Sequence, residues 1–232
     1  MVIDKLEEML NQKGIFLARA DTFKDKLEGT LSRANEVHRA EVYRNNPKLA
    51  AAFARYTEEL AKMKRWTYVS CWRIDENESL RSWQEYASTS EGVAIQTTYG
   101  RIADYTSYNF CAKVRYVDFE ETWVMEGNTL HPFLHKHNEF GWEQEFRIIV
   151  QQFPERDVAF DQVDYYECDS ENPHCGLVLP VDLATFVERI VVGPEASPKF
   201  QEQVLKLATG TGVAGKVQLS SLSQSCASYA PT

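Results

Sequence analysis

The segment that most constrains the fold is residues 141–150, GWEQEFRIIV, in which charged and apolar side chains alternate. Successive side chains of a β-strand point to opposite faces of a sheet. The apolar face would consist of Phe146, Ile148 and Val150, and the charged face of Glu143, Glu145 and Arg147. The segment therefore predicts a strand of a sheet that is dry on one face and charged on the other.

The rest of the chain alternates between strand-like and helix-like segments. The strand-like segments are residues 15–17, 66–72, 93–99, 112–119, 176–181, 188–193 and 216–222. Helix-like segments cover residues 2–12, 78–87 and 197–209, and we also expect a helix in the region that ends near His137. This order predicts an α+β fold, with a mixed, mainly antiparallel sheet and helices packed on it. We expect a single domain over residues 1–232, with a loose tail at 223–232.

A helical insertion is expected between two strands, at residues 31–65. Pro47 suits a first helical turn, and strong helix formers follow it. Lys and Arg are dense here, but four glutamates are interleaved with them, so the run fits a solvated helix face. A phosphate-binding patch is the alternative. Later in the chain, residues 152–175 lack periodicity, which indicates a surface loop or a lid.

Composition excludes several classes of protein. The chain has 232 residues and a net charge of −9, which disfavours a nucleic-acid-binding surface. The first residues are acidic and no apolar run reaches the ~20 residues of a membrane span, so we expect a cytoplasmic protein without a membrane partner. The five cysteines form no CxxC pair, which argues against a disulfide framework or a zinc ribbon.

Common catalytic motifs are absent from the sequence. There is no phosphate-binding glycine loop, no GxSxG elbow and no HExxH helix. His131, His135 and His137 lie close together in HPFLHKH, but no carboxylate completes a ligand set, so we expect no metal.

The charged face of residues 141–150 is the candidate site. Glu143 and Glu145 would stand roughly 7 Å apart along a strand. Breaking a glycosidic bond through an oxocarbenium-like transition state requires a carboxylate close to the sugar. The alternative is that Glu and Arg alternate to make ordinary cross-strand ion pairs.

Five segments, in order, resemble a pattern of the bacterial Domain of Unknown Function family 2971. They are TFKDKLEGT (22–30), SCWR (70–73), SWQEYASTSEGVAI (82–95), Lys136 with WEQEFRII (142–149), and RIVVGP (189–194). The chain departs from the pattern at Lys24, Asp25 and Lys26, where Asn-Asp-Pro is usual, and at Glu91, where His is usual. An N-terminal strand that often bears a basic residue is also missing.

The layout of that family is similar to the layout of ADP-ribosyltransferases, which use NAD. By this resemblance Glu145 would be the catalytic carboxylate and Glu143 would position the acceptor. Ser70 would support the nicotinamide end of the cleft, Trp83 or Tyr86 would form its wall, and Arg147 would belong to the NAD-binding face. We expect Glu143, Glu145 and Ser70 to converge on one cavity.

Two functions from different classes follow. The first is an ADP-ribosyltransferase-like enzyme that uses NAD and transfers to a small-molecule or protein acceptor. The second is a non-catalytic interaction or regulatory module, as in a bacterial stress or antiphage system, whose charged face contacts a partner. Nucleic-acid processing is disfavoured by the charge and by the lack of a carboxylate cluster for metal ions.

Overall fold

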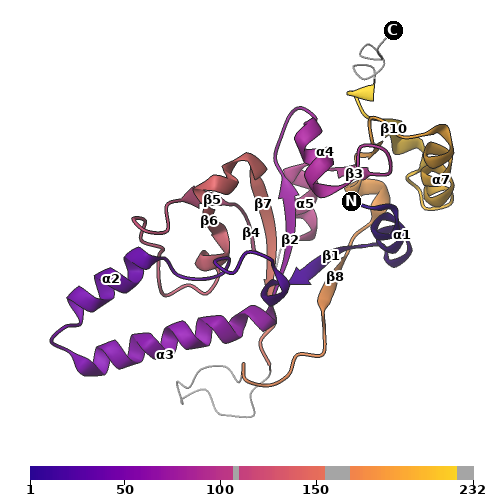
Figure 1. Ribbon diagram of the computed structural model, residues 1–232. Helices are drawn as coiled ribbons and strands as arrows, with labels where there is room; N and C mark the ends of the chain where they lie inside the picture. Colours follow the sequence, from indigo (N-terminus) through magenta and orange to yellow (C-terminus); the bar gives the residue numbers. More distant parts are fainter. Residues whose placement is uncertain (107–109, 155–167, 224–232) are drawn as a thin grey trace, which may run out of the picture. The chain divides into compact units, whose positions relative to one another are not determined.

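The computed structural model describes residues 1–106, 110–154 and 168–223 (Figure 1). It confirms the predicted α+β fold, in which most strand pairs are antiparallel. The contacts divide the chain into two compact units, each of which is built from separate stretches. Unit 1 comprises Met1–Phe16, Asp75–Tyr108 and Val178–Thr232, and unit 2 comprises Leu17–Ile74 and Asn109–Leu177.

Unit 2 is built on an antiparallel sheet that contains the strand predicted from residues 141–150. The sheet places β4 (Phe110–Lys113), β7 (Glu145–Gln151), β2 (Thr67–Arg73) and β1 (Gly14–Arg19) in that order. β7 pairs with β2 over seven residues, from Glu145 opposite Arg73 to Gln151 opposite Thr67. Beyond β1 the sheet ends with β8 (Gly176–Pro180), and the chain passes from one unit to the other within both of these strands.

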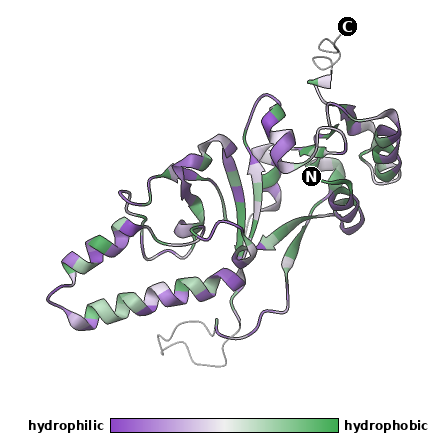
Figure 2. Ribbon diagram, in the orientation of Figure 1, coloured by the Kyte–Doolittle hydropathy of each residue, from purple (hydrophilic) through white to green (hydrophobic). Residues whose placement is uncertain are grey.

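A helical hairpin projects from unit 2 between β1 and β2, where the sequence predicts a helical insertion (Figure 1). Its helices are α2 (Arg33–Val42) and α3 (Pro47–Met63). Ser32 and Asn35 form a reciprocal capping box at the start of α2, and Asn46 caps α3, whose first residue is Pro47. The first half of α3 is rich in alanine, which makes it apolar, but most of its residues are exposed (Figure 2).

The expected helix before His137 is wrong. Residues 118–130 contain neither helix nor strand, and short elements follow them. These are the 3₁₀ helix η3 (His131–Leu134), β6 (His135–His137), which pairs in parallel with β5 (Arg115–Val117), and the 3₁₀ helix η4 (Asn138–Glu143). Pro132 and the aromatic residues of this stretch oppose a long regular helix, and buried Phe133 and Leu134 instead pin it onto the sheet.

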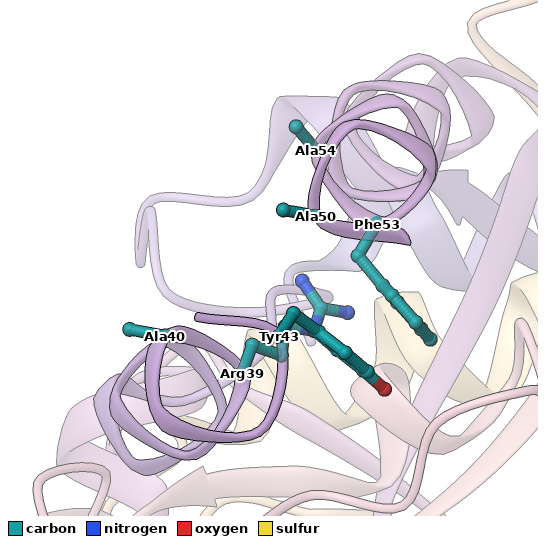
Figure 3. A pocket seen from close by; sticks show the side chains of 6 residues that line it. All are labelled: Arg39, Ala40, Tyr43, Ala50, Phe53 and Ala54. Atoms are coloured by element: carbon teal, nitrogen blue, oxygen red, sulfur yellow. The ribbon is translucent and has the colours of Figure 1, made fainter. Parts of the chain in front are cut away.

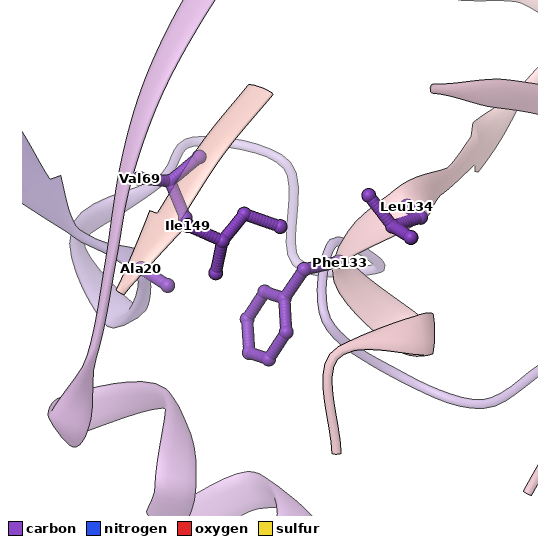
Figure 4. Close-up of a cluster of buried hydrophobic side chains, with 5 residues drawn as sticks. All are labelled: Ala20, Val69, Phe133, Leu134 and Ile149. Carbon is purple, nitrogen blue, oxygen red and sulfur yellow. The ribbon is translucent and has the colours of Figure 1, made fainter. Parts of the chain in front are cut away.

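One core cluster of unit 2 lies on the face of the sheet that bears the odd-numbered residues of β7, and Phe146 and Ile148 are buried on the opposite face. Val69 and Ile149 are opposite one another across β2 and β7 and pack with Ala20, Phe133 and Leu134 (Figure 4). Gly29 has a positive φ of 70°, and a Cβ there would lie 2.4 Å from the Phe133 ring. This glycine therefore lets the loop before the hairpin pass directly over the core aromatic ring.

Unit 1 combines a small sheet with helices. The sheet places β10 (Val217–Leu219), β9 (Arg189–Val192) and β3 (Val93–Gln96) in that order, with β10 parallel and β3 antiparallel to β9. The helices are α1 (Ile3–Gln12), α4 (Leu80–Tyr86), α5 (Tyr99–Tyr105), α6 (Leu183–Phe186) and α7 (Pro198–Ala208). Leu6, Val93, Phe186, Ile190 and Val204 are completely buried, so this unit has its own apolar core.

Several predicted boundaries move by a few residues. The strand expected at 112–119 is split into β4 and β5 by Val114, and the helix expected from residue 78 begins at Leu80, after the capping Ser79. Most of the expected loop at 152–175 and nearly all of the expected tail at 223–232 lie outside the described residues. None of the helices in the described parts is long and apolar enough to cross a membrane.

Candidate functional site

The centre of the candidate site is the ammonium group of Lys136, in β6. Its Nζ donates to Glu143 Oε2 at 2.6 Å and to Glu145 Oε1 at 3.0 Å, and it forms an ion pair with Glu28 Oε1 at 3.0 Å. All four side chains are almost fully buried. One lysine therefore holds three carboxyl groups from three separate parts of unit 2.

Arg147 completes this cluster from β7. Its Nε donates to Glu145 Oε2 at 2.7 Å, its Nη2 lies 3.0 Å from Glu28 Oε2, and its Nη1 donates to the carbonyl oxygen of Phe133 at 2.9 Å. The side chain has no exposed surface. Together, Glu28, Lys136, Glu143, Glu145 and Arg147 form a buried charge cluster.

A left-handed residue places the two predicted carboxylates next to each other. Glu143 ends η4, Gln144 adopts φ 46° and ψ 52°, and β7 begins at Glu145. The Glu145 N–H donates to the hydroxyl oxygen of Tyr116 at 2.8 Å, and the Val114 N–H donates to the Glu145 carbonyl oxygen at 2.9 Å. Both ends of the Glu145 peptide are thus fixed, and its carboxylate is held over the sheet.

The pKa values of the two carboxyl groups are shifted in opposite directions. Burial alone would raise the pKa of Glu145, but the adjacent Arg147 guanidinium outweighs burial and lowers this pKa to about 2. Burial raises the pKa of Glu143, and a hydrogen bond between its carboxyl group and Glu145 raises it further. Because both groups share Lys136, the proton affinity of the pair is divided unequally, with Glu145 the more acidic group and Glu143 the more basic one.

The groups around the pair reinforce this separation. Burial would lower the pKa of Lys136, but Glu143, Glu145 and Glu28 raise it above its usual value, so the amine stays charged. Lys136 Nζ also lies 4.7 Å from the centre of the Phe140 ring. Burial raises the pKa of Tyr116, which keeps its hydroxyl protonated. Pairs of titratable groups whose pKa values are pushed apart are typical of acid–base sites.

The structure brings some of the predicted residues together and separates others. Glu145 and Arg147 share one face of β7, as predicted, but Glu143 lies in η4 rather than on the strand. Ser70 pairs with Ile148, whereas Cys71 pairs with Arg147. Side chains directly opposite in an antiparallel pair share a face, so Ser70 lies on the other face of the sheet from Glu145. The expected convergence of Ser70 with the two glutamates is therefore wrong.

The other two predicted residues, Trp83 and Tyr86, lie on α4 in unit 1. Trp83 is buried and its Nε1 donates to Glu78 Oε2 at 3.1 Å, whereas Tyr86 is half exposed. Glu78 also accepts from the Ser221 N–H at 2.7 Å and from the Ser220 hydroxyl. Trp83 therefore has a role in the packing of unit 1, and a ligand role for it or Tyr86 stays a prediction.

The site analysis of the sequence missed Glu28, Tyr116 and the role of Lys136. Glu28 lies within 22–30 and Lys136 precedes 142–149, so both belong to the segments that resemble family 2971. Their place in these segments was the sequence signal that could have identified Glu28 and Lys136 as site residues. Tyr116 had none, because its contact with Glu145 depends on the pairing of β5 with β6.

No group of three or more His, Cys, Asp or Glu in the described residues could hold a metal ion. Two of the three histidine side chains of HPFLHKH have other partners. His135 Nδ1 lies 2.8 Å from the carbonyl oxygen of His131, and His137 Nδ1 lies 3.3 Å from Glu139. The three carboxyl groups of the charge cluster face Lys136 and Arg147 instead.

Three comparisons, with protein-family models, with curated proteins and with solved structures, found no match to this chain. The resemblance to family 2971 therefore stays a prediction, and the site is interpreted from its own geometry.

Proposed function

We propose that unit 2 contains the catalytic site of a group-transfer enzyme that breaks the nicotinamide–ribose bond of NAD and passes the ADP-ribosyl group to an acceptor. The observation that supports this best is the Glu143–Glu145 pair, in which two buried carboxyl groups share the Lys136 ammonium group while the pKa of Glu145 is lowered and the pKa of Glu143 is raised. Five buried charged side chains reduce stability unless they are well paired. Such clusters are concentrated at functional sites.

In this proposal Glu145 is the catalytic carboxylate. When the bond between the anomeric carbon and the nicotinamide nitrogen breaks, the electron pair leaves with nicotinamide and positive charge develops on the ribose. A carboxylate with a pKa of about 2 remains negative and stabilises that charge. The acceptor then attacks the anomeric carbon and loses a proton. The Glu143 carboxylate accepts this proton as general base, because its raised pKa makes it more basic than Glu145.

The other members of the cluster position these two groups. Arg147 is completely buried and paired with Glu28, Glu145 and the Phe133 carbonyl, so it holds Glu145 in place rather than binding a dinucleotide itself. Lys113 and Arg115 are exposed and flank Val114, whose N–H bonds to Glu145. Lys113 pairs with Phe146 and Arg115 pairs with His135, so both side chains lie on the faces turned away from Arg147 and Lys136 and are not placed to hold the pyrophosphate of NAD beside Glu145.

A specific observation favours the second function, a non-catalytic interaction module. Both cations of the charge cluster are already paired, and its glutamates are only 6–8% exposed. A cluster that serves only to fix β6 and β7 would have this arrangement. The two functions differ in whether the charge state of Glu145 matters beyond folding.

The deciding experiment is incubation with NAD labelled in its adenylate part, with nicotinamide release measured in parallel. The parent, Glu145→Gln and Glu143→Gln are compared with Glu58→Gln, which changes an exposed glutamate of α3. We expect release from the parent and the Glu58 variant, a loss of at least about a hundredfold for Glu145→Gln, and a smaller loss for Glu143→Gln.

Folding is checked for each variant by circular dichroism and thermal melting. Equal rates for the parent and a folded Glu145→Gln, including no release from either, would contradict the enzyme and leave the interaction module. Release by the parent that Ser70→Ala leaves unchanged would agree with the position of Ser70 on the opposite face of the sheet.

A further inference from the structure

A hollow beside the hairpin is the second feature of unit 2 that is suited to binding. It has a volume of about 490 Å³ and is lined by Ala34 and His38 of α2 and by Glu121 and Trp123 of the segment that follows β5. None of these residues belongs to the charge cluster. The hollow therefore represents a separate site.

The indole of Trp123 is held outward by a buried contact directly behind it. Asn35, which has no exposed surface, accepts from the Val124 N–H at 2.9 Å and donates to the Val124 carbonyl oxygen at 2.8 Å. Its amide also donates to Glu126 at 2.7 Å. These bonds fix the Val124 peptide and turn its side chain completely inward, so Trp123 and Met125 point to solvent.

Three large apolar side chains are exposed around the hollow. Trp123 is 48% exposed and Met125 is 53% exposed, and Val37 on α2 is also half exposed. Exposed tryptophan and methionine are enriched where proteins bind partners. Because the backbone next to Trp123 is already fixed by Asn35, less backbone entropy is lost when this segment binds a partner.

The charges at the hollow select a cation. Glu121 lines it, and the neighbouring Glu120 is also exposed. Arg33, which precedes Ala34, is neutralised by Glu36 at 3.1 Å. An indole face attracts guanidinium and ammonium groups, and a carboxylate beside it adds a charge-assisted hydrogen bond. The hairpin contains the same kind of contact, because the Arg39 guanidinium lies 5.0 Å from the Phe53 ring (Figure 3). Arg39 is also paired with Glu126.

We propose that this hollow binds an arginine side chain of a basic segment of a partner protein, with the guanidinium over Trp123 and against Glu121. The smaller hollow between α2 and α3, of about 220 Å³, does not compete for such a ligand (Figure 3). Its own cation, Arg39, already fills that role, and Tyr43 stacks on Phe53 at 4.7 Å beside it.

The test uses the full chain and two short peptides of alternating glycine and arginine or glycine and citrulline, because citrulline has the shape of arginine without its charge. Binding is followed by titration calorimetry at low salt and by the indole N–H signals in NMR spectra. We expect the arginine peptide to bind and to shift one indole signal, and we expect its affinity to fall as salt is added. The citrulline peptide should bind at least about tenfold more weakly.

Four variants locate the site. Trp123→Ala should lower the affinity for the arginine peptide roughly tenfold, and Trp123→Phe should retain part of that affinity. Glu121→Gln should lower the affinity for the arginine peptide by about threefold, whereas Glu58→Gln, away from the hollow, should leave this affinity unchanged. Equal binding of the two peptides, an unchanged affinity in a folded Trp123→Ala, no binding at all by the parent, or preference for an acidic peptide or for RNA would each overturn the proposal.

Discussion

Unit 2 has two regions rich in charged residues, the charge cluster and the helical hairpin, and they use the same residue types in opposite ways. In the cluster every charged side chain is at most 10% exposed, and each cation contacts two or three carboxyl groups. The hairpin pair Arg33–Glu36 leaves more than 60% of both side chains exposed. Charge density alone therefore says little about function. Burial decides whether a glutamate has a shifted pKa or is a solvated surface group.

The largest expected effect is from Lys136→Met, which tests whether the cluster depends on its central cation. Removing one partner of a buried ion pair leaves uncompensated charge, so this variant should lose about 3–5 kcal/mol of stability. Arg33→Met, which removes a cation from an exposed pair, should lose at most about 0.5 kcal/mol. Urea unfolding followed by circular dichroism measures both. Similar losses in the two variants would remove the contrast between the regions.

The second effect is a pH dependence that belongs to the cluster alone. The folded-state pKa of Glu145 is lowered, so its contribution is present above the unfolded value near 4.3 and is lost as the pH falls toward 2. That contribution is on the order of 3 kcal/mol. The folded-state pKa of Glu143 is raised, so its contribution is present below the unfolded value and is lost as the pH rises through the folded pKa.

Urea midpoints measured between pH 2 and pH 8 test this pair of slopes. Glu145→Gln should flatten the acid side of the profile, and Glu143→Gln should flatten the slope at higher pH. Glu58→Gln in the hairpin should leave the parent profile unchanged. A parent profile that is already flat between pH 2 and pH 5 would show that Glu145 is not stabilised as an anion.

The third prediction concerns Asn35, a fully buried polar residue of α2. Asn35→Ala removes the partners of the Val124 N–H and carbonyl group inside the protein, and should lose about 2 kcal/mol. Asn45→Ala, in the exposed connection between α2 and α3, is the matched control and should change stability by less than about 0.5 kcal/mol. Equal thermal midpoints for the two variants would show that the buried hydrogen bonds of Asn35 add no stability.

The smallest expected effect is at Gln144, whose left-handed backbone joins η4 to β7. Gln144→Gly relieves this conformation and should stabilise the protein by roughly 0.5 kcal/mol. Lys13→Gly relieves a similar conformation, φ 49°, at the end of α1 and should give a similar gain. The two differ in function, because only Gln144 separates Glu143 from Glu145. Nicotinamide release that falls in Gln144→Gly alone would show that the rigidity of this turn positions the pair.

Much of the architecture was predictable because it follows from local periodicity. The α+β class, the antiparallel sheet and the hairpin inserted before β2 all follow from alternating apolar residues, caps and helix formers. The segment between β5 and β7 was not, because Phe133 and Leu134 have apolar spacing that fits a helix as well as a 3₁₀ turn. Packing against Val69 and Ile149, which are distant in sequence, decides between the two (Figure 4).

The site was predictable only in part, for a similar reason. Alternation correctly placed Glu145 and Arg147 on one face of a strand, because that relation is local. Which residues of other strands join them depends on pairing, and β2 pairs with β7 so that Cys71, not Ser70, lies opposite Arg147. A shift of one residue in that pairing would reverse the faces. The sequence does not encode that choice locally.

The discontinuity of the two units affects the order in which the chain can fold during synthesis. All of unit 2 has been made once residue 177 leaves the ribosome, whereas unit 1 still lacks everything from Val178 onward. β3, at residues 93–96, must wait for β9, at residues 189–192, before it has its antiparallel partner. The charge cluster can thus assemble on a nascent chain while the strands of unit 1 remain unpaired.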